Sequence, residues 1–195
     1  MIRTELFTGP AIAAHLPTLS AMRMAVFRAW PYLYDGSLPS EADTLSSFAT
    51  SQTAGLVIAF DDDTPIGAST CVHMPEEDDH ITLPFREAGW DLGRICYFGE
   101  SVLLSRYRGL GIGVRFFELR ESHARTMPGV DTTTFCAVVR PDTHRLKPAD
   151  ALPLDAFWHK RGYASTDLAC KMSWKQVDSD DKVENTLRFW TKTLV

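Results

Sequence analysis

The segment that decides the fold runs from Ser101 to Phe117 and reads SVLLSRYRGLGIGVRFF. An apolar strand leads into a basic, glycine-rich turn, and the turn leads into an amphipathic helix. Three arginines surround this turn: Arg106, Arg108 and Arg115. Glycines leave the backbone open to a ligand, and the first turn of a helix carries unpaired N–H groups at the positive end of the helix dipole. The segment therefore predicts a phosphate or pyrophosphate site.

The spacing of the glycines narrows the choice of ligand. A P-loop would end in Gly-Lys-Ser/Thr, and a dinucleotide fingerprint would read G-x-G-x-x-G near the first strand. The chain instead fits R-x-x-G-x-G, with Arg108, Gly111 and Gly113. This pattern resembles motif A of the GCN5-related N-acetyltransferase (GNAT) superfamily, whose members bind the pyrophosphate of acetyl-CoA there. A glycine-rich helix start without a ligand is the alternative.

Predicted strands and helices also follow one another along the rest of the chain. Hydrophobic spacing predicts strands at 2–7, 54–60, 66–73, 94–104, 132–139 and 170–177. Helices are expected from Thr8 or Pro17 to Trp30, from a capping box at 40–43 to about Ser51, over 111–126, and around 154–162. Residues 74–93 are expected to form a long loop with one helical turn, and such a loop is more often functional than idle.

A second string supports the same resemblance. Residues 153–163 read PLDAFWHKRGY and are similar to motif B of the GNAT superfamily, an A-x-F-Y-x-K-x-G-F type string. The resemblance covers about residues 2–177. It implies an α/β fold in β-α-α-β-β-β-α-β-α-β order, with a mixed, mostly antiparallel sheet of six to seven strands flanked by about four helices. Residues 1–195 are then one domain, with 178–195 as an extension that is a strand, a short helix or a homodimer contact.

Composition limits the class of protein. A chain of 195 residues with 45% hydrophobic content suits one compact domain. A net charge of −5 argues against a nucleic-acid partner. The longest apolar run, 54–60, is too short for a membrane span, and the first residues lack a signal-peptide core, so a soluble, cytoplasmic protein is expected. The four cysteines are widely spaced, which predicts no metal site and no disulfide.

The resemblance implies how the co-substrate is held. Backbone groups of Val102 to Leu104 would pair with the pantetheine arm, and the N–H groups of 108–113 would hold the pyrophosphate. The residues expected to contact acetyl-CoA are Val102, Leu103, Leu104, Arg108, Gly109, Leu110, Gly111, Ile112, Gly113 and Val114.

Acetyl transfer needs a group that removes a proton from the acceptor amine. Glu100 is the candidate, because it lies in an otherwise apolar run from Ile95 to Leu104. A carboxylate in such a run is either paired or has a raised pKa. A purely structural acid, paired with a neighbour, is the alternative to catalysis.

The group that protonates the leaving thiolate is less defined. Relatives often carry tyrosine where this chain has Trp158, and an indole N–H is no practical proton donor. The candidates are Tyr107, which we take as the catalytic assignment, together with Tyr97, His144, His159 and solvent water. Tyr163 is expected in the core, and Cys136, in the middle of a strand, is expected to pack rather than to form an acyl-enzyme.

The acceptor pocket in this superfamily lies between the first two helices and the loops opposite them. The matching residues here are Trp30, Tyr32, Tyr34 and Asp35, which form either a pocket wall or a hydrophobic plug. The acidic run 76–79 either attracts a cationic amine or is a solvated face. Two functions are open: an N-acetyltransferase for a small-molecule or peptide amine, and a non-catalytic acyl-CoA-binding sensor.

Overall fold

The computed structural model describes residues 1–194, without the side chain of Asp43. The strands are β1 (Ile2–Thr8), β2 (Gly55–Asp61), β3 (Thr64–His73), β4 (Ile95–Tyr97), β5 (Ser101–Leu103), β6 (Thr132–Val138), β7 (Ala164–Lys175) and β8 (Lys182–Thr193). The α-helices are α1 (Leu16–Phe27), α2 (Leu38–Thr50), α3 (Asp79–Glu87), α4 (Ile112–Ala124) and α5 (Asp155–His159). Short 3₁₀ turns cover Gly9–His15, Met74–Glu76, Leu92–Arg94 and Ser105–Tyr107.

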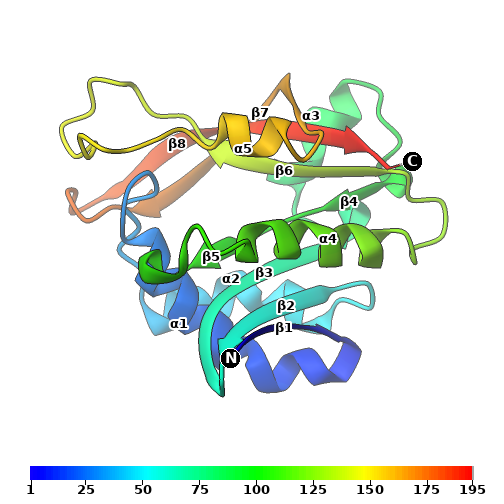
Figure 1. Cartoon of the computed structure of the whole chain (residues 1–195). Coiled ribbons are helices and arrows are strands. Elements are labelled where there is room, and N and C mark those ends of the chain that lie inside the picture. The colour runs from blue at the N-terminus through cyan, green and yellow to red at the C-terminus, as the bar shows by residue number, and fades with distance from the viewer. Residues whose placement is uncertain (195) are drawn as a thin grey trace.

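The strands form one mixed sheet in the order β1-β2-β3-β4-β6-β8-β7, and β5 pairs with β3 beside this path (Figure 1). Of the described strand pairs, only β4 with β6 is parallel; the others are antiparallel. The predicted mostly antiparallel α/β fold is confirmed.

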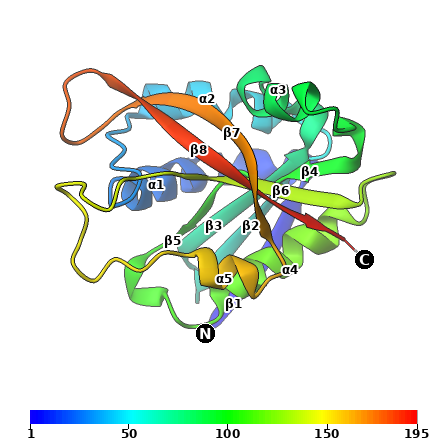
Figure 2. The same ribbon diagram turned by 90° about the horizontal axis from the view of Figure 1, so that it is seen from above.

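Helices cover both faces of the sheet (Figure 2). On one face, α1 and α2 pack on Leu56 and Ile58 of β2, while α3 packs near Val72 and Cys136. On the opposite face, α4 packs on alternate residues of the same strands, such as Val57. Because neighbouring side chains of a strand point to opposite faces, each strand contributes to both layers of the core.

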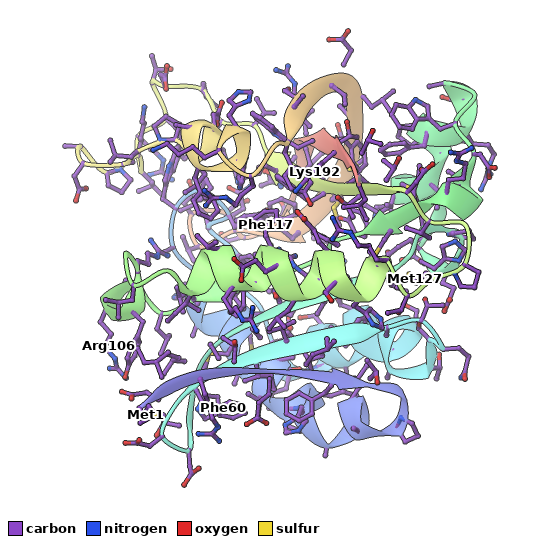
Figure 3. The ribbon with its side chains drawn as sticks, turned by 45° about the vertical axis from the view of Figure 1, so that its right-hand side comes forward. Met1, Phe60, Arg106, Phe117, Met127 and Lys192 are labelled. Carbon is purple, nitrogen blue, oxygen red and sulfur yellow. The ribbon has the colours of Figure 1, made fainter. Side chains whose placement is uncertain are left out.

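The segment after Asp178 is an integral part of the sheet. β8 lies between β6 and β7, and Leu187, Phe189 and Trp190 are almost fully buried. Lys192 of β8 forms a 2.8 Å ion pair with Glu121 of α4, and Figure 3 labels Lys192 near that helix. Of the three alternatives left open, the strand is confirmed. The apolar side chains that suggested a dimer contact are covered by the chain itself.

Three local expectations need correction. The second helix is capped by Ser37, whose hydroxyl accepts from the Ser40 N–H while the Ser40 hydroxyl accepts from the Ser37 N–H. The capping box therefore begins three residues before the predicted one, whose aspartate side chain lies outside the described residues. Residues 79–87, expected in a long loop with one helical turn, form the nine-residue helix α3, because Ile81 and Phe85 at four-residue spacing bury one face despite Pro84.

The single strand expected over 94–104 is divided into β4 and β5. Thr70 of β3 faces two residues of this strand: its carbonyl accepts from the Gly99 N–H, and its N–H donates to the Glu100 carbonyl. Two residues opposite one define a β-bulge. A Cβ on Gly99 would lie 2.6 Å from the Thr70 hydroxyl oxygen, so glycine allows this close approach.

The bulge opens the sheet. Up to Phe98, whose N–H donates to the Thr134 carbonyl, the strand pairs with β6. Beyond the bulge, β5 pairs with β3, and the described residues show no ladder between β5 and β6. A buried arginine of α4, Arg120, donates weakly to the carbonyls of Thr70 and Glu100 at 3.4 Å and so supports the bulge from the side of α4.

Candidate active site

The glycine-rich turn has the predicted form. Gly111 is the N-cap of α4 with φ of +81°, and Gly109 has the same φ. L-residues rarely adopt this conformation, and no atom lies within 4 Å of where a Cβ would be built at either position. Among the described residues, the backbone N–H groups of 109–113 have no acceptor. The turn therefore exposes a set of donors at the positive end of α4.

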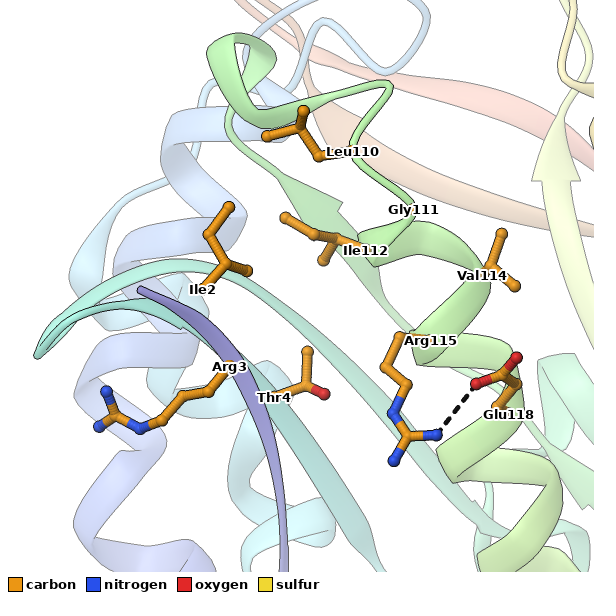
Figure 4. Close-up of a pocket in the computed structure, with 9 residues that line it drawn as sticks. All are labelled: Ile2, Arg3, Thr4, Leu110, Gly111, Ile112, Val114, Arg115 and Glu118. Atoms are coloured by element: carbon orange, nitrogen blue, oxygen red, sulfur yellow. Dashed lines mark hydrogen bonds and ion pairs between the residues drawn. The ribbon is translucent and has the colours of Figure 1, made fainter.

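The three arginines around this turn differ in whether they are paired with a carboxylate. Arg106 stacks on the Tyr107 ring at 5.0 Å, and Arg106 and Arg108 take part in no ion pair with a described residue. Arg115 is paired with Glu118 at 3.0 Å. Figure 4 shows this pair beside a shallow groove of about 430 Å³ between the first turn of α4 and β1, lined by Leu110 and Ile112. Two arginines are thus available to an anion on the turn.

The edge of β5 that faces β6 has free backbone groups. Val102 pairs with Ala68, and the Leu104 N–H donates to the Ile66 carbonyl, so the even-numbered residues face β3. In an antiparallel ladder the alternate residues point the other way. The N–H and C=O groups of Ser101 and Leu103 are therefore directed into the opening between β5 and β6.

Glu100, the candidate base, is paired. Its carboxylate accepts from the guanidinium of Arg23 in α1 and, at 2.5 Å, from the Thr70 hydroxyl. Arg23 also donates to Glu41 of α2 at 2.6 Å. A carboxylate in an apolar run was expected to be either paired or raised in pKa, and the structure shows that Glu100 is paired.

The Arg23 network is buried. Glu41 is fully buried and Arg23 nearly so. Burial acts to lower the pKa of Arg23, but the carboxylates of Glu100 and Glu41 outweigh burial and raise it. Arg23 was not among the predicted site residues, although its spacing from Leu19 and Phe27, four residues on either side, places it on the buried face of α1.

Tyr107 lies away from the opening. Its hydroxyl donates to Asp61 at the end of β2, at 3.1 Å. In the order β2-β3-β5, Asp61 lies on the far side of β5 from β6. The structure therefore does not bring this hydroxyl together with the free edge of β5, and the assignment of Tyr107 as proton donor lacks support from geometry.

Trp158 and Tyr163 of the motif B string both lie in the core on the α4 side of the sheet. Trp158 packs on Phe135 and Trp190 in the core around α4. Tyr163 is buried and bonds to Thr133 and Glu121, so the expectation of a core residue is confirmed.

The remaining donor candidates also have partners. His144 packs on Trp30, and His159 packs on Trp190. Tyr97, on the face of α3, contacts the Cys136 thiol at 3.2 Å. Burial raises the pKa of the Tyr97 hydroxyl, and the hydrogen bond with Cys170 together with burial raises the pKa of the Cys136 thiol. A thiol held protonated in this way is a poor nucleophile.

The structure separates the four predicted acceptor residues. Tyr32 lies at the opening, where burial and then the charges of Cys136 and Glu100 raise the pKa of its hydroxyl. Tyr34 contacts Ser40 of the α2 cap, and Asp35 is paired with Arg28 and Lys175. Trp30 packs on His144, whereas Tyr32 interacts with Glu100 itself and Tyr34 interacts with Glu41 and Arg23 of the network that holds Glu100.

Glu77 was predicted only as part of an acidic run, and its carboxyl interacts with the charge of Glu100. It follows the 3₁₀ turn at the end of β3, and its N–H donates to the Met74 carbonyl. Burial raises the pKa of its carboxyl from 4.5 to about 7, and the charges of Glu100 and Asp78 act in the same direction. Nothing in the run 76–79 distinguishes Glu77 from its neighbours, because its surroundings come from β4 and β6.

Two further observations limit the site. No group of three or more His, Cys, Asp or Glu side chains within the described part of the chain could hold a metal ion. In residues 1–194, no helix has both the length and the apolar character needed to cross a bilayer.

Comparison with known proteins identifies the fold. No protein-family model matches the sequence, and no curated protein matches it. Solved structures do match over the whole chain. A GNAT-family acetyltransferase from Staphylococcus aureus is 10% identical with a TM-score of 0.60, and the match covers 100% of both chains.

Two other solved structures agree with the first. A ribosomal-protein-alanine N-acetyltransferase from Brucella melitensis is 15% identical with a TM-score of 0.61, covering 100% of this chain and 99% of that one. The loading GNATL domain of CurA from Lyngbya majuscula is 14% identical with a TM-score of 0.60, covering 98% of each. The chain therefore has the fold of the GCN5-related N-acetyltransferases.

Proposed function

We propose that this protein is an acetyl-CoA-dependent N-acetyltransferase that acts on an amine of a small molecule or of a peptide N-terminus. The observation that carries the proposal is the opening between β5 and β6 beside the donor-rich turn at the start of α4. Together they connect an anion site at one end of the sheet with the face that holds Glu100, Tyr32 and Tyr97. The names of the structural neighbours agree with this proposal.

The residues present fit acetyl-CoA. The N–H groups of 109–113, with Arg108 close by, would hold the pyrophosphate, and the outward backbone groups of Ser101 and Leu103 would pair with the amides of the pantetheine arm, as a strand pairs with a sheet edge. When bound, acetyl-CoA supplies an activated acyl group as a thioester. A backbone N–H of β5 would polarise the thioester carbonyl.

The acceptor would approach from the face of α1, α2 and α3. Tyr32 and the Glu100 carboxylate border that side of the opening. Arg23 and Thr70 hold Glu100 in place, which orients its negative charge towards an incoming ammonium group.

Calorimetric titration with acetyl-CoA tests the cofactor site. Gly111→Asp puts a side chain and a negative charge on the turn and should weaken binding at least about tenfold. Gly129→Asp is a matched control, because Gly129 has φ of +79° and equally open surroundings but lies beyond the other end of α4. Wild-type protein that does not bind acetyl-CoA would refute the proposal.

A non-catalytic acyl-CoA sensor is the second candidate. Trp158 stands where relatives often have tyrosine, and Glu100 is committed to Arg23 and Thr70. An amine panel with detection of released thiol separates the two functions. Turnover above the rate without amine establishes the enzyme, whereas tight binding with no such turnover favours the sensor.

A further inference from the structure

A buried cation lies behind the bulge that opens the sheet. Arg120 is 1% exposed, because its spacing from Phe116 and Phe117 places it on the buried face of α4. Within residues 1–194 its guanidinium forms no ion pair, and the carboxylate of the adjacent Glu121 is bonded to Lys192 at 2.8 Å instead. Burial lowers the pKa of Arg120, but a guanidinium in a protein stays protonated. An arginine is rarely buried in this way without a carboxylate as its partner.

Backbone carbonyls and aromatic rings surround this charge. Nη1 of Arg120 donates to the carbonyls of Thr70 and Glu100, each at 3.4 Å. The guanidinium carbon lies 4.3 Å from the centroid of the Phe98 ring and 5.0 Å from that of Phe117, and the faces of aromatic rings attract cations. Partial charges rather than a carboxylate hold the guanidinium, so its positive charge acts on the peptide groups beside it.

The Glu100 carbonyl belongs to the first peptide unit beyond the bulge. It accepts from the Thr70 N–H of β3 at 3.0 Å as well as from Arg120. In a trans peptide the N–H points away from the carbonyl, and the register of β5 with β3 directs the Ser101 N–H into the opening. Hydrogen bonds at one end of a peptide unit polarise its other end. Two donors at the carbonyl therefore make the Ser101 N–H a stronger donor.

The next outward N–H of β5 lacks this support. The Leu103 N–H shares its peptide unit with the carbonyl of Val102, which the register places opposite Ala68 of β3. In the part of the chain that the structure describes, Arg120 donates to the carbonyl of Glu100 and no side chain donates to that of Val102. The Ser101 N–H is therefore the more strongly polarised of the two.

Acetyl transfer needs such a donor. As the amine nitrogen forms the C–N bond to the thioester carbonyl carbon, negative charge develops on the carbonyl oxygen. The C–S bond then breaks, and the proton that the nitrogen loses passes to the leaving thiolate. A donor that is aimed at the carbonyl oxygen and fixed before the reaction lowers the barrier. The ladder between β5 and β3 fixes the Ser101 N–H in this way.

Resting on the proposed function, we infer that the Ser101 N–H donates to the thioester carbonyl oxygen and that Arg120 is a positioning residue that strengthens this donor through the Glu100 carbonyl. Arg120 acts from the α4 side of the sheet, behind the peptide unit. Its charge is in place before the amine attacks, so no reorganisation accompanies the reaction.

The kinetic test compares three variants. Arg120→Met removes the charge and should lower kcat about tenfold or more with an amine that the wild type acetylates, because the oxygen loses part of its stabilisation. Arg120→Lys keeps the charge and should retain at least about threefold more kcat than Arg120→Met. Glu121→Gln is the matched control, because it removes a buried charge from the adjacent position but its partners are Tyr163 and Lys192. It should change kcat less than about threefold, and all three should bind acetyl-CoA with nearly the wild-type affinity in calorimetry.

Two spectroscopic readouts separate this role from a structural one. A hydrogen bond to a carbonyl deshields the nitrogen of the same peptide unit, so Arg120→Met should move the ¹⁵N shift of Ser101 upfield in the free protein and leave that of Leu103 in place. The carbonyl stretch of ¹³C-labelled acetyl-CoA falls when the oxygen accepts a strong hydrogen bond. It should lie lower on the wild type than in solution and move back towards the solution value on Arg120→Met.

Each contrary result has its own meaning. A wild type that binds no acetyl-CoA overturns the proposed function, and the inference with it. Binding with the carbonyl stretch at its solution value overturns the inference alone, and this measurement needs no variant. A folded Arg120→Met with wild-type kcat, or with the ¹⁵N shift of Ser101 unchanged, overturns the role of Arg120. If Arg120→Met does not fold, Arg120→Gln removes the same charge and is judged by the same two measurements.

Discussion

The buried ion-pair network around Arg23 gives the sharpest stability prediction. Arg23 of α1 donates to Glu41 of α2 at 2.6 Å and also to Glu100, so one cation joins two helices to the bulged strand. Glu41 is 0% exposed, and its second carboxylate oxygen has no hydrogen-bond partner among the described residues. Arg23→Met would therefore leave a buried charge at Glu41 without its cation.

The magnitude follows from this burial. Removing one partner of a buried ion pair costs about 3–5 kcal/mol, because the remaining charge is neither paired nor hydrated. Glu100 adds little to this cost, because its side chain is 17% exposed and keeps the Thr70 hydroxyl. For a domain of this size, about 2–4 °C in Tm accompanies each kcal/mol, so Arg23→Met should lower Tm by about 6–20 °C.

A double variant separates the charge from the packing. Replacing both partners of a buried pair with apolar residues is often close to neutral. Arg23→Met with Glu41→Leu should therefore be more stable than Arg23→Met alone by at least about 2 kcal/mol. Urea unfolding at pH 7 measures both values. A loss below about 1 kcal/mol in the single variant, or no recovery in the double variant, would contradict this reasoning.

Three further predictions concern single side chains. The pKa of Glu77 is about 7 in the folded protein, compared with an ordinary value of 4.5. Between pH 4.5 and about 7 the unfolded chain therefore binds fewer protons than the folded chain, and the free energy of unfolding falls as pH rises. Glu77→Gln should thus be more stable than wild type at about pH 8 by up to about 3 kcal/mol, with no such gain at about pH 4, in urea unfolding. Tyr107→Phe should cost about 1 kcal/mol through the bond to Asp61 but leave turnover unchanged; a large loss of kcat would restore Tyr107 as a catalytic candidate. Trp190→Ala should cost about 3–5 kcal/mol by urea unfolding, since β8 is an inner strand, and a loss below about 1 kcal/mol would contradict that placement.

Much of the fold could be predicted because local patterns agree with it. The strand, basic turn and helix of 101–117 need only neighbouring residues to form, and glycine at 109 and 111 is required by their positive φ. The strands at 2–7, 54–60 and 132–139 were also predicted to within a residue or two. Only one turn of helix α3 was expected within a long loop, because Pro84 and a single turn of apolar residues gave a weak periodic signal.

The candidate site could be predicted only in part. The cofactor turn is one continuous segment, so its chemistry can be recognised from spacing alone. The acceptor side is assembled from α1, α2, the end of β3 and the bulge after β4, and Arg23 and Glu100 are 77 positions apart. No local pattern reports that Glu100 has a cation as its partner.

Short-range spacing and backbone conformation were enough to establish the order of most elements, the glycine-rich anion turn and the resemblance that explains it. The position of β8 inside the sheet, the bulge at Gly99 that separates β5 from β6, and the pairing of Glu100 became visible only in the folded chain. These features depend on which distant strands and helices meet. Burial and pairing set the charge of a carboxylate, and both arise from contacts between segments that no local pattern connects.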